Sequence, residues 1–302
     1  MKENTPTVGV VGLGSMGGGM ARSLVRAGLA THGFDVDAAR VAEFCAEGGH
    51  GGSFAEVGPM LDIIATVVVN ADQTETVLFG ENGLASVLRK GTVILSCATV
   101  SPDFARAMEA RCASLGLLYL DAPISGGSVK AGQGALSIMA SGSDAAFEAA
   151  QPALDAMAGN VFRLGGAAGA GSALKVINQM LAGVHIAAAA EAITFGISQG
   201  VDPQTTVDVI SKCAGSSWMF ENRGPHIADG DYTPHSAVDI FVKDLGIVSD
   251  VARAAKFSAP LSAVALQQFV AAAGAGYGRE DDAAVAKIYA RNAGLELPKS
   301  ED

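Results

Sequence analysis

Short apolar runs alternate with amphipathic segments along the first half of the chain. Runs rich in β-branched and aliphatic residues predict strands at residues 7–11, 31–34, 63–69, 92–97, 117–120, 135–140 and 161–164. Between them, apolar residues recur every three or four positions and predict helices at residues 16–28, 37–49, 102–116 and 144–159. This alternation predicts an α/β fold built on a doubly wound, mostly parallel sheet.

The pattern changes after Gly165, where strand signals largely stop and helical periodicity dominates. Helices are predicted from residue 173 to about 199, and again from Pro203, Ala237 and Pro260 onward. We therefore predict a dinucleotide-binding domain at residues 1–166 and an all-α substrate and oligomerisation domain at residues 167–302, divided at the glycine-rich "LGGAAGAGS". The apolar run 176–197 is long enough to span a bilayer, but its four polar residues favour a core helix.

Length and charge restrict the classes of function. A chain of 302 residues favours two domains, and 49% hydrophobic against 17% charged residues is a globular composition. The net charge of −11 argues against nucleic acid and anionic membranes as partners. Four widely spaced cysteines form no metal-ligand pattern, so we expect reduced, buried thiols and no metal. No export signal precedes the first strand, which predicts a cytoplasmic protein, and the apolar helical half predicts a homo-oligomer.

A glycine-rich segment after the first predicted strand carries the clearest chemical signal. In "GLGSMG", Gly12, Leu13, Gly14, Ser15, Met16 and Gly17 form a GxGxxG motif between a strand and a helix, which is typical of dinucleotide binding. Asp35 ends the second strand at about the 20-residue offset expected for an acid that binds the ribose hydroxyls. This carboxylate predicts NAD instead of NADP. The alternative is a glycine turn without a ligand, followed by a capping aspartate.

Two further segments suggest a substrate side. The turn Ser125, Gly126, Gly127 follows a predicted strand, so we expect it at the carboxyl edge of the sheet, where its backbone N–H groups suit a carboxylate; a purely structural turn is the alternative. Lys175 lies in the apolar stretch "GAGSALKVINQM". In one alternative, its aliphatic chain lies along an apolar surface and its ammonium reaches water. In the other, the ammonium is held in a closed cleft, where desolvation lowers the pKa of the lysine and favours proton transfer.

These segments together resemble the β-hydroxyacid dehydrogenase family. Four motifs match in order over nearly the whole chain, namely "GLGSMG" (12–17), "DAPISGG" (121–127), "GAGSALKVINQ" (169–179) and "KDLGI" (243–247). The resemblance implies an N-terminal Rossmann-type domain, an all-α C-terminal domain and an NAD-dependent oxidoreductase acting on CH–OH groups.

The resemblance also assigns roles to single residues. It makes Lys175 the catalytic lysine and residues 125–127 the carboxylate cradle. The cofactor contacts that it implies, beside the glycine-rich segment, are Val69, Asn70, Thr99 and Lys243. Many relatives carry asparagine four residues after the lysine, whereas this chain has Gln179 there and Asn178 beside it. Either amide therefore remains a candidate for the substrate hydroxyls.

The segment 214–248 looks most like the L-threonate dehydrogenase branch of this family, which implies oxidation of a four-carbon acid sugar at C2. Reduction of tartronate semialdehyde and oxidation of 3-hydroxyisobutyrate are the alternatives within the family. Imine reduction is disfavoured because those relatives have a different residue at the lysine position. A non-catalytic NAD-sensing module is the alternative from another class. We expect Trp218, Phe220 and Phe241 to be core residues, and His226 and His235 to be loop or capping residues.

Overall fold

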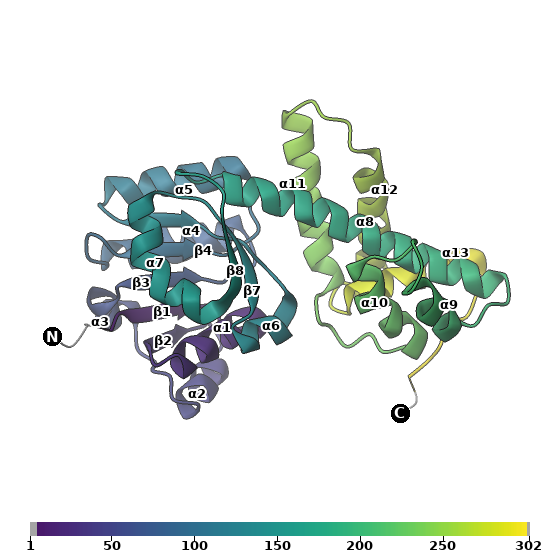
Figure 1. Ribbon diagram of the computed structural model, residues 1–302, viewed down its shortest axis with the longest axis horizontal. Helices are drawn as coiled ribbons and strands as arrows, with labels where there is room; N and C mark the ends of the chain where they lie inside the picture. The colour runs from purple at the N-terminus through teal and green to yellow at the C-terminus, as the bar shows by residue number, and fades with distance from the viewer. Residues whose placement is uncertain (1–4, 301–302) are drawn as a thin grey trace. The chain divides into compact units, whose positions relative to one another are not determined.

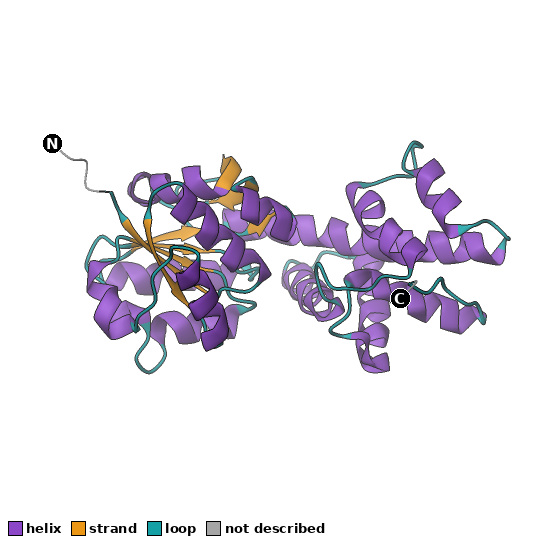
Figure 2. Ribbon diagram, turned by 90° about the horizontal axis from the view of Figure 1, so that it is seen from below, coloured by secondary structure: helices purple, strands orange, loops and turns teal. Residues whose placement is uncertain are grey.

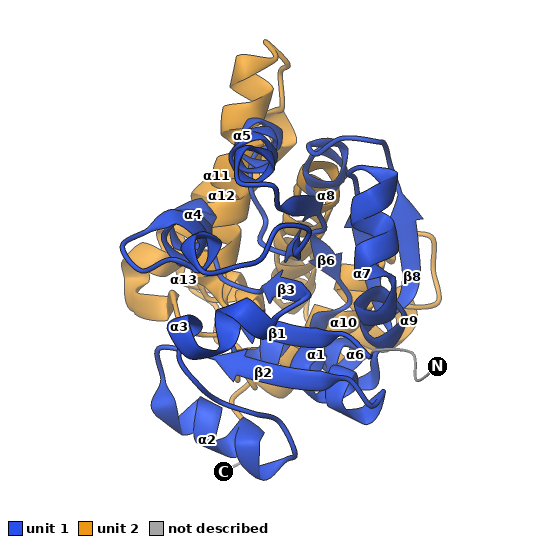
Figure 3. Ribbon diagram, turned by 90° about the vertical axis from the view of Figure 1, so that its left-hand side faces the viewer, with its two compact units in different colours: residues 1–175 blue, residues 176–302 orange. Residues whose placement is uncertain are grey.

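The apolar runs of the first half form strands in the computed structural model, which describes residues 5–300 (Figure 1). The chain divides into two compact units, residues 1–175 and 176–302, coloured separately in Figure 3, and each is described by itself. The strands are β1 (Thr7–Val11), β2 (Ala30–Phe34), β3 (Ile63–Thr66), β4 (Val93–Ser96), β5 (Leu118–Asp121), β6 (Ile124–Ser125), β7 (Leu136–Ala140) and β8 (Ala158–Arg163). All of them belong to the first unit, where Figure 2 shows the strands in orange.

The main sheet of this unit has five parallel strands in the order β2-β1-β3-β4-β5. Successive side chains of a strand point to opposite faces, and both faces here are apolar. Val10, Ala65 and Leu95 belong to one core cluster, whereas Val11 and Ile64 belong to another. Burial on both faces is why these strands read as continuous apolar runs and not as alternating ones.

Helices cover both faces of the main sheet. The first-unit helices are α1 (Ser15–Arg26), α2 (Ala38–Ala46), α3 (Phe54–Val57), α4 (Ala71–Phe79), α5 (Pro102–Ser114), α6 (Gly127–Gln133) and α7 (Asp144–Met157), with short 3₁₀ turns η1 (Gly58–Met60) and η2 (Leu84–Ser86). Residues of α1, α6 and α7 pack in the first core cluster, and residues of α3, α4 and α5 in the second. The α/β class is therefore as predicted, although α3, α4 and α6 were not predicted.

The predicted single sheet is wrong in one respect, because the last three strands form a separate sheet. Its order is β6-β7-β8, with β6 antiparallel and β8 parallel to β7. Backbone hydrogen bonds between Asp121 and Ser141 join the two sheets at the end of β5. The predicted strand 63–69 also ends early, at Thr66, because Asn70 begins α4.

Every helix or strand among the described residues of the second unit is a helix. Its elements are α9 (Pro203–Ile210), α10 (Trp218–Asp229), α11 (Val238–Ala254), α12 (Pro260–Ala272), η3 (Ala273–Tyr277), η4 (Asp282–Val285) and α13 (Ala286–Ala293), after the long helix α8 (Ala170–Ser198), which starts in the first unit. Phe220 and Phe241 are core residues as expected, and Phe241 stacks on Phe269 with ring centroids 5.3 Å apart. Trp218 is 56% exposed, so that expectation is wrong.

Helix α8 is the one helix among the described residues that is long and apolar enough to cross a membrane, by length and composition only. In its most apolar stretch 44% of the residues are buried, and we interpret α8 as a core helix with one uncovered side. That side exposes large apolar side chains, with Ile177 at 52% and Leu181 at 53%.

The cysteines depart from the sequence prediction. Cys97 and Cys112 are buried, and burial raises the pKa of each thiol to about 12. Cys45 and Cys213 are exposed, contrary to the expectation that all four are buried. All four are free thiols, as expected.

Candidate active site

The predicted cofactor segments of the first unit lie at one edge of the main sheet. The glycine-rich segment follows β1 and Asp35 follows β2, while Asn70 and Thr99 follow β3 and β4. The strand order reverses at β1, which has β2 on one side and β3 on the other. Ligands of α/β proteins bind outside the carboxyl ends of the strands at such a reversal. The fold thus brings these four segments together where a dinucleotide is expected.

Two glycines of the glycine-rich segment, Gly12 and Gly17, have no room for a side chain. Gly12 has a φ of +94°, and a Cβ placed on it would lie 2.4 Å from the carbonyl oxygen of Val67. A Cβ on Gly17 would lie 1.8 Å from the carbonyl oxygen of Gly12. Gly14 is the N-cap of α1 and offers no side-chain cap, and the first turn of α1 contains no acidic residue. The uncapped N–H groups of α1 therefore suit the pyrophosphate of a dinucleotide.

Asp35 is a buried carboxylate, with its side chain 7% exposed. Its Oδ2 accepts the N–H of Leu13 at 2.6 Å, and its Oδ1 accepts the N–H of Asp37 at 2.9 Å. The guanidinium of Arg40 on α2 lies 3.8 Å from Asp35. We did not predict Arg40, because its place beside the acid depends on how α2 returns to the end of β2. The site thus holds both an acid that suits the ribose hydroxyls and a cation beside it.

The turn after β3 is shaped by the start of α4. Asn70 is the N-cap of α4, and its side chain accepts the N–H of Gln73 at 2.8 Å. Val69, which is 48% exposed, donates its N–H to the Gln73 side chain at 2.9 Å. Thr99 lies partly buried in the loop between β4 and α5. These contacts give Asn70 a structural role that the sequence did not predict.

We expected the turn at Ser125 at the carboxyl end of the main sheet. In the structure it lies in the second sheet instead. Ser125 ends β6 and pairs with Ser137. Gly126 and Gly127 have φ values of +131° and +77°, which side-chain-bearing residues rarely adopt. Gly126 is the N-cap of α6 without a side-chain cap, so backbone N–H groups remain available beside the Ser125 hydroxyl.

A buried aspartate holds the start of α8. Asp121 is 1% exposed, and its carboxylate accepts the N–H groups of Gly169 at 2.9 Å and Ser172 at 2.8 Å. It also accepts the hydroxyl of Ser172 at 2.7 Å and that of Ser141 at 3.3 Å. Local sequence patterns do not predict this contact, because it joins residues about 50 positions apart. Asp121 thereby fixes the first turn of the helix that carries Lys175.

Lys175 follows one turn later and is 8% exposed. Little of this side chain is in contact with water, which favours the closed-cleft alternative over snorkelling. The burial therefore favours a lysine with a specific role.

The amides after Lys175 belong to a network within the second unit. Gln179, 7% exposed, donates through Nε2 to Oδ2 of the buried Asp244. Asn178 Nδ2 donates to Gln179 Oε1 at 2.8 Å. Because an ionised carboxylate only accepts, the Gln179 nitrogen must face Asp244, and its oxygen must then face Asn178.

Lys243 on α11 completes this network. Its ammonium lies 2.8 Å from Asp244 Oδ1, as an ion pair outside good hydrogen-bond geometry. Asp244 is 1% exposed, so its pair with Lys243 is not a solvated surface ion pair. The network thus joins Asn178, Gln179, Asp244 and Lys243.

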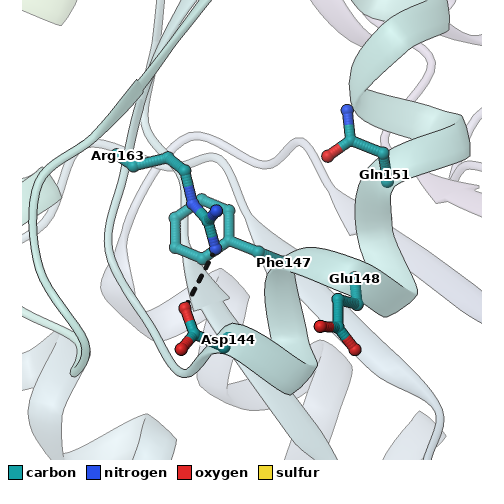
Figure 4. Close-up of a pocket in the computed structure, with 5 residues that line it drawn as sticks. All are labelled: Asp144, Phe147, Glu148, Gln151 and Arg163. Carbon is teal, nitrogen blue, oxygen red and sulfur yellow. Dashed lines mark hydrogen bonds and ion pairs between the residues drawn. The ribbon is translucent and has the colours of Figure 1, made fainter.

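A depression elsewhere in the first unit involves none of these residues. It has a volume of about 410 Å³ and is lined by Asp144, Phe147, Glu148, Gln151 and Arg163 (Figure 4). The guanidinium of Arg163 lies 4.0 Å from the centre of the Phe147 ring and 3.2 Å from Asp144. Its charge is already neutralised there, so we assign this depression no part in the chemistry.

Comparison with known protein families supports a nucleotide-dependent enzyme. Residues 7–166 match the NAD binding domain of 6-phosphogluconate dehydrogenase. Residues 169–289 match the domain described as NAD-binding of NADP-dependent 3-hydroxyisobutyrate dehydrogenase.

Individual relatives match over nearly the whole chain. An L-threonate dehydrogenase from Cupriavidus necator is 54% identical, over 96% of this chain and 97% of the relative. One from Escherichia coli K12 is 50% identical, over 96% of each. A solved structure described as 3-hydroxyisobutyrate dehydrogenase from Salmonella typhimurium has a TM-score of 0.89 and 51% identity, over 93% of this chain and 99% of that one. The described activities of these relatives concern two hydroxy acids, L-threonate and 3-hydroxyisobutyrate.

Proposed function

Since the chain belongs to the β-hydroxyacid dehydrogenase family and is an NAD-dependent oxidoreductase acting on CH–OH groups, we propose that it oxidises L-threonate at C2 to the 2-oxo acid. The family resemblance and the NAD cofactor predicted from the sequence are confirmed. The observation that supports L-threonate as the proposed substrate is the 54% identity to an L-threonate dehydrogenase over 96% of the chain. A carboxylate-bearing substrate also agrees with the uncapped N–H groups at the start of α6.

In this proposal Lys175 moves the proton. When bound, NAD supplies the acceptor for the hydride that leaves C2. The C2 hydroxyl loses its proton to Nζ of Lys175, which must be neutral at that moment. In the reverse direction the Lys175 ammonium polarises the carbonyl and returns the proton. Burial of Lys175 supports this role because the proton is then exchanged with the substrate and not with bulk water.

The turn at residues 125–127 binds the substrate carboxylate in this proposal. The hydroxyl of Ser125 and the uncapped N–H groups at Gly126 and Gly127 donate to the two oxygens. Holding the carboxylate fixes which carbon faces the cofactor, and such orientation is a large part of catalysis.

Of the two amides, we assign the substrate contact to Asn178. Both ends of the Gln179 amide are already engaged, by Asp244 and by Asn178. Asn178 Oδ1 is left to accept a substrate hydroxyl, and Gln179 acts as a positioning residue. The cofactor contacts proposed from the family, at Val69, Asn70, Thr99 and Lys243, remain part of this proposal.

We further propose a cytoplasmic homo-oligomer. The apolar side chains exposed on α8, Leu174 at 38%, Ile177 at 52% and Leu181 at 53%, support a second copy as the cover of this helix. Neither nucleic acid nor a membrane is a proposed partner.

Steady-state rates with NAD separate the candidate substrates. L-Threonate, D-threonate, D-glycerate and 3-hydroxyisobutyrate are compared by kcat/KM, and L-threonate is expected to be the best substrate. A higher kcat/KM for 3-hydroxyisobutyrate than for L-threonate would contradict the proposed substrate and favour the activity described for the Salmonella structure.

Lys175→Met tests the mechanism independently of the substrate. We expect kcat to fall by about 10³-fold while NADH affinity is unchanged, because general acid–base catalysis contributes about 10²–10⁴-fold. Lys90→Met is the control, since Lys90 is exposed. Equal loss of NADH binding in the Lys175 variant would indicate a structural lysine, and NADH binding by the wild type without turnover of any hydroxy acid would indicate an NAD-sensing module.

A further inference from the structure

Three side chains with metal-ligating atoms converge in the second unit, and the proposed reaction uses none of them. His226 lies in the last turn of α10, His235 in the loop before α11, and Asp281 just before η4. One ligand atom from each lies within 4.8 Å of the others. They come from sequence segments up to 55 residues apart, so the fold and not local sequence brings them together.

Backbone contacts hold this arrangement. His235 donates its N–H to Asp281 Oδ2 at 2.9 Å, and Asp281 donates its own N–H to the carbonyl of Tyr232 at 3.0 Å. Ala237 and Asp281 form an isolated antiparallel bridge. Hydrogen bonds therefore join the loop 230–237 to residues 280–282. The His235 backbone cannot move away from the Asp281 carboxylate without breaking them.

The hydrogen bond of the His226 ring leaves its other ring nitrogen available to coordinate a metal ion. His226 Nδ1 lies 2.9 Å from the carbonyl oxygen of Asp231, and because a carbonyl only accepts, Nδ1 carries the hydrogen. The lone pair of the neutral ring is then on Nε2. A backbone carbonyl on the other ring nitrogen is the usual support of a metal-binding histidine. The His235 ring lies 4.7 Å from the His226 ring, nearly perpendicular to it.

The surrounding charge also suits a cation. Asp281 is fully buried, and the same holds for its neighbour Asp282. One guanidinium, that of Arg223, faces both, at 3.6 Å from Asp281 and 2.5 Å from Asp282. Arg223 lies closer to Asp282, so the carboxylate of Asp281 is the less well compensated of the two, and a metal ion would supply positive charge beside it.

We propose that His226, His235 and Asp281 bind a divalent transition-metal ion of the zinc type. Two imidazole nitrogens and one carboxylate oxygen are a ligand set that Zn²⁺ accepts, with water completing the coordination. Donors bound to Zn²⁺ at about 2.0–2.1 Å lie roughly 3.4 Å apart in a tetrahedron, so the ligands must close in slightly. His235 is exposed, and rotation of its ring supplies that movement. The ion joins the end of α10 to the segment before η4.

Cobalt(II) provides a direct probe of this site in the full-length, tag-free protein. We expect one Co²⁺ per chain, with a visible absorption band that Zn²⁺ abolishes by displacement, and a higher unfolding temperature when Zn²⁺ is added. Mg²⁺ is expected to have neither effect, because it prefers oxygen ligands. Absence of the Co²⁺ band, or displacement by Mg²⁺ as readily as by Zn²⁺, would overturn the proposal.

Variants identify the ligands. His226→Gln/His235→Gln is expected to lower Zn²⁺ affinity at least about tenfold, the loss usual for altered ligation. The matched control is His32→Gln/His50→Gln: these rings also lie together, 5.2 Å apart, and His32 Nδ1 is 3.1 Å from the Gly51 carbonyl. Within residues 5–300 this pair is in no group of three metal-ligating side chains.

Unchanged Zn²⁺ affinity in the first double variant, or equal loss in both, would contradict the assignment. If the first double variant does not fold, His235→Gln alone decides, because its side chain is exposed and its backbone bond to Asp281 is retained.

Discussion

Replacing Asp121 by asparagine tests how the start of α8 is held. The carboxylate accepts two backbone N–H groups, of Gly169 and Ser172, and two hydroxyls. An asparagine whose oxygen takes the place of Oδ2 keeps both backbone bonds, but as bonds to a neutral acceptor. Its amide nitrogen then faces the Ser172 hydroxyl, which can turn to accept from it.

The expected losses follow from these bonds. Hydrogen bonds to a charged group are worth about 1.5–3 kcal/mol against about 0.5–1.5 for neutral ones, so two weakened backbone bonds cost about 2 kcal/mol. Loss of a negative charge at the start of a helix adds about 0.5 kcal/mol. Asp121→Ala leaves two buried N–H groups without a partner, at about 1–3 kcal/mol each, and opens a cavity, for a total of about 4–5 kcal/mol. The series wild type, Asn and Ala should therefore be graded.

Urea unfolding and hydrogen exchange of residues 165–180 measure this series. We expect faster exchange in the first turn of α8 and a lower kcat, because Lys175 follows that turn. We expect unchanged NADH affinity because the proposed cofactor contacts, apart from Lys243, follow β1 to β4. Asp103→Asn is the control: it removes an 87% exposed carboxylate from the first turn of α5. Wild-type exchange and kcat in Asp121→Asn, or equal changes in the control, would refute the reasoning.

Three further predictions concern the first unit and the thiols. Asp35→Ala should favour NADP by about thirtyfold in kcat/KM ratio, since one charge about 5 Å from a phosphate of charge about −2 is worth roughly 2 kcal/mol at a dielectric constant of about 60. Adding Arg40→Ala should reverse most of that gain in NADP preference. Unchanged cofactor preference in both variants would show that Asp35 does not select NAD. Gly17→Ala should weaken NADH binding and lower the unfolding temperature, because its Cβ has no space, whereas Gly132→Ala, with nothing within 4 Å, should do neither. A thiol reagent at pH 8 should label the two exposed cysteines and spare the two buried ones, whose pKa burial raises to about 12; four equally fast thiols would contradict that burial.

Features that depend on short stretches of chain were predictable from the sequence. The glycine-rich segment lies between one strand and the next helix, so its spacing together with those flanking elements and Asp35 predicted a dinucleotide as its ligand. The parallel sheet followed from apolar runs that are buried on both faces. Lys175 stood out because a charged residue in an apolar helix is unusual.

Features that depend on long-range contacts were not predictable in this way. Asp121 meets the start of α8, and Gln179 meets Asp244 65 residues later, which no local pattern encodes. Arg40 is only five residues from Asp35, but its place beside the acid depends on the geometry of the turn from β2 into α2, which the hydrophobic pattern does not specify. The separate second sheet depends on β6, a strand of two residues, which is too short to give a periodic signal.

The two compact units meet in sequence between Lys175 and Val176, inside α8 and not in a loop. A chimaera of two relatives that crosses over at this peptide bond inherits the nucleotide segments and the lysine from one parent. It inherits Asn178, Gln179 and their partner Asp244 from the other. In the proposed function, such a crossover exchanges the amides that contact the substrate hydroxyls while keeping the lysine and the carboxylate turn at residues 125–127.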